Sequence, residues 1–184
     1  KGGVTPGTLT LYVMTPYTWT GAAANSNFSD GGNWCGNVVS NACQGDMAAP
    51  NGSQKAIFDG TCTSNCDATI GSTTSLGGLH LNEGYSGTIT QGVGVDLTVG
   101  ALGYMQAGGS FIGSSDAGDD LNVYTYSTPN IIISGGTFRA PRGIFTIRYG
   151  FVVSAVANFV HNNGLLRTVG DCGCSYARGR IELN

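Results

Sequence analysis

Three clustered aspartates are the side chains in this sequence that best suit acid–base catalysis. Asp116, Asp119 and Asp120 lie in the segment Ser-Ser-Asp-Ala-Gly-Asp-Asp. Paired carboxyl groups cleave glycosidic bonds in many hydrolases, so sugar cleavage is one interpretation of this segment. Adjacent strand residues point to opposite faces, however, and Gly, Ser and Asp together are typical of a turn. A turn is therefore the favoured interpretation, with a sugar-cleaving site or a Ca²⁺ site as the alternatives.

Two histidines are the only imidazole bases available for a catalytic triad. His80 stands between Leu79 and Leu81, so it is predicted to point away from the apolar face into solvent. His161 precedes Asn162-Asn163-Gly164, which is a turn signal. Neither context indicates catalysis, and the sequence predicts a protein that is not an enzyme and holds no cofactor.

Six cysteines occur as three neighbouring pairs, namely Cys35 and Cys43, Cys62 and Cys66, and Cys172 and Cys174. An even number of grouped cysteines in a chain poor in lysine indicates an oxidising compartment outside the cytoplasm. Closing a short loop costs the least chain entropy, which favours the Cys35–Cys43 and Cys62–Cys66 disulfides. A four-thiolate zinc site that combines the second and third pairs is the alternative.

The composition is that of a folded, β-rich chain. Glycine supplies 31 of 184 residues and charged residues supply 10 %, against usual shares of about 7 % and about 25 %. The apolar fraction of 41 % is sufficient for a buried core, and the length suits one domain. Lysine and glutamate are scarce while Thr, Ser, Asn and Val are abundant, so strands and turns are favoured over helices.

Charge and hydropathy argue against nucleic-acid and membrane partners. The net charge is −3 and no run of Lys or Arg is present, so a nucleic-acid site is not expected. The longest weakly polar stretch, 150–160, is too short to cross a bilayer. The first residue, Lys1, is not a start residue, and we expect a chain that is already processed.

Short alternating strand signals recur at nearly constant spacing. Leu97-x-Val99, Leu121-x-Val123 and Phe145-x-Ile147 follow one another at intervals of 24 residues, and Leu79-x-Leu81 lies 18 residues before the first. Periods near twenty are typical of a β-solenoid, in which each coil buries its apolar face on the next. A single-domain parallel β-helix is therefore the predicted fold, with a β-sandwich as the alternative.

A second repeat runs in step with the first. Gly-Gly-Ser-Phe at 108–111 is followed by Gly-Gly-Thr-Phe at 135–138 and by a degenerate copy that ends at Phe159. We expect Phe111, Phe138 and Phe159 to point inward and stack as a column, while the glycines allow sharp corners.

Several short blocks resemble one family of proteins. Trp-x-Gly at 19–21, Asn-x-Ser-Asp at 27–30 and Asn33-Trp34 precede Gly-Tyr-x-Gly-x-Ile at 84–89 and the Gly-Gly-Thr-Phe block. In these blocks the sequence resembles bacterial secreted surface proteins with autotransporter-passenger-like parallel β-helix repeats, over most of residues 17–165. The resemblance implies a right-handed coil and an extracellular or cell-surface location. The chain departs from the pattern where arginines replace small polar residues after Phe138.

Charge is distributed unevenly along the chain. Residues 1–138 hold two lysines and nine acidic residues, whereas residues 139–184 hold six arginines and two acidic residues. Because order along a solenoid chain is position along its axis, the molecule is predicted to be basic at its C-terminal end, which favours head-to-tail contact between copies. The alternative is that the charges scatter around the coils and cancel locally.

The N-terminal segment offers a strand outside the resembling region. A Gly-rich lead is followed by an alternating stretch made of Thr8, Leu9, Thr10, Leu11, Tyr12, Val13 and Met14. We interpret 1–16 as an extension and 17–184 as the solenoid domain. No capping helix is visible at either end, so the predicted function is a structural protomer that assembles head-to-tail into an extracellular fibre or surface layer through this strand. The strand could equally pair within its own chain.

An exposed aromatic platform is the alternative functional interpretation. Five tyrosines could form it: Tyr85, Tyr104, Tyr124, Tyr126 and Tyr149. Tyrosine rings on one sheet face are typical of carbohydrate-binding surfaces. A carbohydrate-binding or adhesive module that contacts surface glycans is therefore the second hypothesis.

Overall fold

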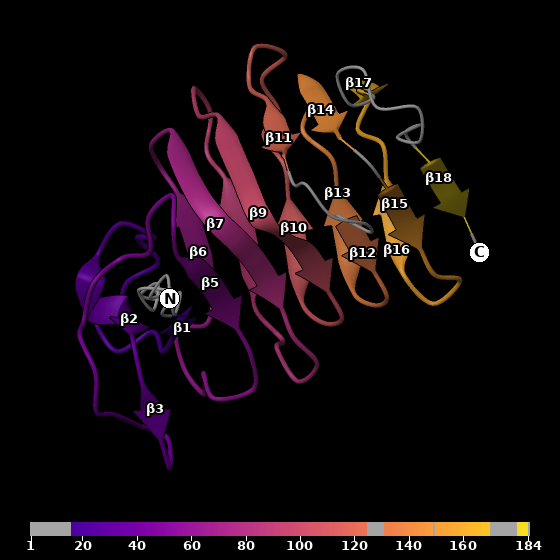
Figure 1. Cartoon of the computed structure of the whole chain (residues 1–184). Helices are drawn as coiled ribbons and strands as arrows, with labels where there is room; N and C mark the ends of the chain where they lie inside the picture. The colour runs from indigo at the N-terminus through magenta and orange to yellow at the C-terminus, as the bar shows by residue number, and fades with distance from the viewer. Residues whose placement is uncertain (1–15, 125–130, 149, 170–179, 184) are drawn as a thin grey trace, which may run out of the picture.

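Short parallel strands stack side by side along one axis, from β1 at one end to β18 at the other (Figure 1). The computed structural model describes residues 16–124, 131–148, 150–169 and 180–183. Strand pairings between successive coils are parallel, and the antiparallel pairs are β1 with β2 and β3 with β4. Parallel stacked coils form a β-solenoid, as the repeats predict, and this excludes the β-sandwich.

Most strands contain only two to four residues. They are β1 (Pro16–Trp19), β2 (Trp34–Cys35), β3 (Val38–Val39), β4 (Ala42–Cys43), β5 (Lys55–Phe58), β6 (Ala68–Ile70), β7 (Thr74–Leu81), β8 (Thr88–Gln91), β9 (Leu97–Gln106), β10 (Ser110–Ile112), β11 (Leu121–Val123), β12 (Ile131–Ile133), β13 (Thr137–Arg139), β14 (Ile144–Ile147), β15 (Gly150–Val153), β16 (Asn158–Val160), β17 (Leu165–Thr168) and β18 (Arg180–Leu183). The 3-10 turn η1 (Gly31–Asn33) precedes β2.

The strand pairing divides the solenoid into three sides. The first side contains 74–76 of β7, 97–99 of β9, β11, β14 and β17. The second contains β1, β5, 79–81 of β7, 104–106 of β9, β12, β15 and β18. The third contains β6, β8, β10, β13 and β16. The long strands β7 and β9 therefore each run through two sides.

The predicted phenylalanine column lies on the third side and is confirmed. Phe111, Phe138 and Phe159 are in register on β10, β13 and β16. The ring centroids are 5.3 Å apart between Phe111 and Phe138, and 5.8 Å apart between Phe138 and Phe159, with nearly parallel planes. Successive side chains of a strand point to opposite faces. The residues on either side of each phenylalanine point outward, so the ring itself points into the core.

One interval that the sequence predicts for the first repeat is wrong. The spacing of 18 residues between Leu79 and Leu97 is not one coil, because the two residues lie on different sides. Leu97 pairs with Thr74, and Leu79 pairs with Tyr104. The error arises because one long strand, β7, supplies two sides, and short alternating signals alone do not show where a strand turns a corner.

Aspartates support the stacking of coils at one corner. Asp96 Oδ1 accepts a hydrogen bond from the backbone N–H of Asp120, and Asp120 Oδ1 accepts one from the N–H of Ile144, both at 2.8 Å. Both donors lie 24 residues after the acceptor, which is the repeat seen in the sequence. A carboxylate that binds the N–H of the next coil satisfies a donor that a corner would otherwise leave unpaired.

Candidate functional site at the ends of the solenoid

The N-terminal end of the described coils is closed by the chain's own residues. Strand β2 pairs antiparallel with the edge of β1 that faces away from β5. On the third side, Asn27 forms a bridge to Thr69 of β6. The expectation of an uncapped N-terminal end is therefore wrong, because the cap is built from the irregular segment 20–50 and needs no helix.

An aromatic cluster fills the core beneath this cap. Its members, all buried, are Trp19, Phe28, Trp34 and Phe58. The Trp34 ring lies 4.8 Å from Phe28 and 5.1 Å from Trp19 between centroids, in edge-on geometry. Trp34 Nε1 donates to the backbone carbonyl of Phe28 at 2.7 Å, so the indole N–H is satisfied although it is buried.

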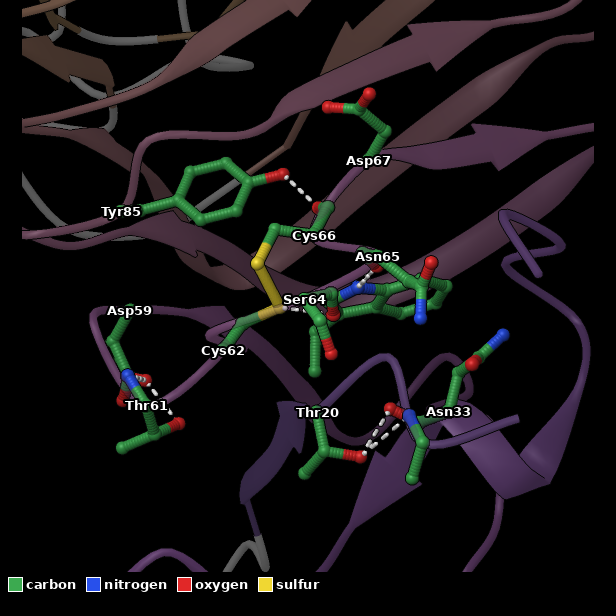
Figure 2. Close-up of a disulfide and its surroundings, with 12 residues drawn as sticks. Thr20, Asn33, Asp59, Thr61, Cys62, Ser64, Asn65, Cys66, Asp67 and Tyr85 are labelled. Carbon is green, nitrogen blue, oxygen red and sulfur yellow. Dashed lines mark hydrogen bonds between the residues drawn. A yellow bond between two sulfur atoms is a disulfide. The ribbon is translucent and has the colours of Figure 1, made fainter. Parts of the chain in front are cut away.

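The buried side-chain amide of Asn33 organises the turn that forms the cap. It donates to the carbonyl oxygens of Asn25 and Asn27 at 3.1 and 3.2 Å, and its Oδ1 accepts from the N–H of Ala23. The Thr20 hydroxyl donates to the Asn33 carbonyl at 3.1 Å (Figure 2). The Asn33-Trp34 block of the sequence is therefore explained by the cap.

Both disulfides pair the cysteines that local loop closure favours. The Cys35–Cys43 bond links β2 to β4, the second strand of the β3–β4 hairpin. The Cys62–Cys66 bond closes a corner loop, and the Cys66 carbonyl accepts a 2.8 Å hydrogen bond from the Tyr85 hydroxyl of the next coil (Figure 2). Because Cys62 and Cys66 are bonded to each other, the zinc alternative is wrong. Cys172 and Cys174 lie outside the described residues.

The C-terminal end differs from the N-terminal end. Within the described ranges, β16 pairs only with β13 and β17 only with β14, so each has a free edge. Apolar side chains are exposed here, with 81 % of Val156 and 56 % of Leu165 accessible. Residues 139–169 contain four arginines and no acidic residue, whereas residues 16–138 contain nine acidic residues and one lysine. The end with free strand edges is therefore basic.

The structure separates the three clustered aspartates into different hydrogen-bonding roles. Asp119 is buried and accepts from the Ser114 hydroxyl at 2.6 Å and from the N–H of Gly94 at 2.8 Å. Asp120 binds the next coil, and Asp116 accepts from Gly118 within its own turn. The favoured interpretation as a turn is confirmed. Across the described parts of the chain, no three His, Cys, Asp or Glu side chains converge as metal ligands.

The two histidines occupy different environments. His161 is exposed next to Asn162 and Asn163, which both adopt positive φ of 59°, as the turn signal predicts. His80 points outward but is half-buried rather than fully solvated, and its Nε2 lies 3.1 Å from the Leu102 carbonyl. Burial lowers the pKa of the His80 imidazole, the nearby Lys55 charge also lowers it, and the bond to Leu102 opposes both.

Acidification is expected to destabilise the fold through His80. Since its folded pKa lies below the ordinary value of 6.5, the unfolded chain binds a proton more readily, and stability falls as the pH drops below about 6.5. Urea unfolding at neutral and mildly acidic pH measures this change. The His80→Gln variant should lose that part of the pH dependence, whereas His161→Gln should retain it. An identical pH profile for His80→Gln and the native protein contradicts the prediction.

The tyrosine platform is not formed as predicted. Tyr85 and Tyr104 are buried in the core, and burial raises the pKa of both hydroxyls. The Tyr104 hydroxyl donates to Gln106 Oε1 at 2.6 Å. Strand β9 turns a corner before Tyr104. The corner shifts the alternation of side chains between the two faces of the strand, so Tyr104 points into the core. Tyr124 is 37 % exposed, with the Arg148 guanidinium 5.9 Å from its ring centroid, while Tyr126 and Tyr149 lie outside the described residues.

A pocket of about 310 Å³ lies at the N-terminal cap between the β3–β4 hairpin and the Cys62–Cys66 loop. Its lining combines hydroxyl groups of Thr20, Thr61 and Ser64 with the apolar side chain of Met47. The pocket lacks a charged lining residue. The predicted interface strand, Thr8 to Met14, lies outside the described residues.

Comparison with known proteins identifies no relative of this chain. No protein-family model, curated protein or solved structure matches the chain. Within the described ranges, no helix is long and apolar enough to cross a membrane.

Proposed function

We propose that the chain is a structural protomer that assembles head-to-tail into an extracellular fibre or surface layer. The observation that carries the proposal is the difference between the two ends. The N-terminal end is closed by β2, whereas no strand among the described residues pairs with the outer edges of β16 and β17 at the C-terminal end. Free edges accept added strands, and a contact between two different surfaces produces filaments when it does not close into a ring.

Charge supports the same direction of assembly. The basic end carries exposed Arg142 and Arg167, while Asp30, Asp46 and Asp67 lie on the first coils. Contact between the C-terminal end of one copy and the N-terminal end of the next therefore joins opposite charges. In the sequence, only Thr15 separates the predicted Thr8–Met14 strand from β1.

The disulfides support the proposed location outside the cytoplasm. Two disulfides in a chain of this length are typical of proteins that fold in an oxidising compartment. The resemblance of the 19–34 and 84–89 blocks to secreted bacterial surface proteins is in keeping with it.

Deleting residues 1–14 is expected to abolish fibres and leave the solenoid folded. Negative-stain imaging measures assembly and circular dichroism measures the fold. A point variant with Leu9, Leu11 and Val13 replaced by serine should have the same effect, because it removes the apolar face of the strand. Replacing Thr8 and Thr10 by serine is the matched control and should leave assembly intact.

Two results would refute the proposal. Native protein that remains as isolated particles at high concentration argues against a fibre or layer. Fibres of native length from the deletion variant would show that the N-terminal strand does not link the copies.

A further inference from the structure

Two Asn-Gly pairs occur in the sequence, Asn51-Gly52 and Asn163-Gly164. In such a pair the backbone nitrogen of the glycine can attack the side-chain amide carbon of the asparagine, because glycine has no Cβ to obstruct the approach. This reaction converts the asparagine to an acidic residue without the help of an enzyme. The two pairs have very different surroundings in the structure.

The first pair lies in an exposed turn that leads into β5. Asn51, Gly52 and Ser53 are all exposed, and the Gln54 N–H closes the turn by donating to the Asn51 carbonyl at 2.8 Å. The Asn51 side chain is folded forward over this turn. Its Oδ1 accepts a hydrogen bond from the Ser53 N–H at 3.2 Å and another from the Ser53 hydroxyl at 3.1 Å. Two donors therefore polarise the amide carbonyl that the glycine nitrogen would attack.

The attacking nitrogen of the first pair is accessible as well. Among the residues that the structure describes, none accepts a hydrogen bond from the Gly52 N–H, so water can remove its proton. The position is also open, because the atom nearest to an added Cβ at Gly52 would be the Ser75 hydroxyl oxygen at 3.5 Å. Neither a hydrogen bond nor close packing therefore holds the Gly52 nitrogen away from the Asn51 side chain.

The second pair is held by the preceding coil. An added Cβ at Gly164 would lie against the carbonyl oxygen of Pro141 and 2.6 Å from that of Gly143. The Leu165 N–H corresponds in position to the serine N–H of the first turn, but it donates to the Gly143 carbonyl at 2.9 Å. The backbone of this pair therefore cannot rotate toward the asparagine side chain without breaking contacts between coils.

We propose that Asn51 is a site of spontaneous deamidation in the folded protein and that Asn163 is protected from it. The co-reactant is water, and the product carries one more negative charge in the turn before β5. The site is independent of the proposed assembly.

The atoms of the reaction balance without an oxidant or reductant. The Gly52 nitrogen gives its proton to water and forms a bond to Cγ of Asn51, and negative charge collects on Oδ1, where both Ser53 donors lie. The bond from Cγ to Nδ2 then breaks, and Nδ2 leaves as ammonia with a proton from water. The cyclic imide that remains is opened by a second water molecule at either carbonyl, which yields aspartate or isoaspartate. The net change is one water consumed and one ammonia released.

Incubating the folded full chain in mildly alkaline buffer tests the site. Peptide mapping by mass spectrometry is expected to show both aspartate and isoaspartate at position 51, with Asn163 unchanged over the same period. In water enriched in oxygen-18, the new carboxylate should carry the label, because water opens the imide. An unchanged Asn51, equal conversion at the two asparagines, or aspartate without isoaspartate overturns the proposal.

Two variants measure the contributions of the neighbouring residues. Gly52→Ala adds a Cβ where the fold has room, so conversion should slow about tenfold while circular dichroism stays unchanged. Ser53→Ala should slow conversion about fivefold, which is the effect of one ordinary hydrogen bond to the reacting oxygen. Ser115→Ala, at another exposed serine, is the matched control and should leave the rate unchanged. A native rate in the Ser53 variant would refute the role of its hydroxyl.

Denaturation tests whether the structure protects the second pair. In guanidinium chloride the contacts between coils are lost, so Asn51 and Asn163 should convert at similar rates. An Asn163 that stays unchanged in denaturant would show that its protection does not come from the preceding coil.

Discussion

Replacing Phe138 with alanine is expected to lower the free energy of unfolding by about 4 kcal/mol, which is within the range measured for buried Phe→Ala changes. Phe138 is fully buried, and its ring lies 5.3 Å from the rings of Tyr104, Phe111 and Phe145 between centroids. The cavity left by alanine cannot collapse easily, because backbone hydrogen bonds on both sides hold β13 between β10 and β16.

The matched control for Phe138 is Phe159, the last ring of the same column. Phe159 is only partly buried, so Phe159→Ala should cost less than about half as much. Urea unfolding gives the midpoint and slope for both variants, and an unchanged slope shows that the loss is one of stability. Equal losses at the two positions would show that the column does not concentrate stability at its centre.

Replacing Gly136 with alanine is expected to cost about 3 kcal/mol or more. Gly136 has φ +72°, a conformation that costs an L residue about 1–2 kcal/mol. An added Cβ would also lie against the carbonyl oxygen of Gly109 and 2.9 Å from the carbonyl carbon of Gly108. Both contacts are with the backbone of the preceding coil, so relief requires the two coils to separate.

Two other glycines separate the causes of this loss. Gly94 has φ +78° but nothing within 4 Å of an added Cβ, so Gly94→Ala should cost only the conformational part, about 1–2 kcal/mol. Gly71 has open space and no positive φ, so Gly71→Ala should change stability by less than about 0.5 kcal/mol. If Gly136→Ala lowers the free energy of unfolding by no more than Gly94→Ala does, contact with the preceding coil does not add to the loss of stability at Gly136.

Local patterns were sufficient for the repeating part of the molecule. Period-two alternation around Phe111 and Phe138 assigned the inward face, and the recurrence of that pattern showed stacked coils. The disulfide pairing was also predictable, because short loops dominate the closure entropy. The continuous apolar triplets at 131–133 and 151–153 also indicate strands that are apolar on both faces.

The sequence by itself determined the fold class, the phenylalanine column and the local disulfides, because each depends on residues whose relation is set by a short repeat or a short loop. Only the tertiary structure decided which end is closed and why Tyr104 is buried. Those features depend on where a strand turns a corner and which distant segment covers its edge. Both are set by packing between coils, in which residues more than twenty positions apart fill the same core. A local sequence pattern does not predict that packing.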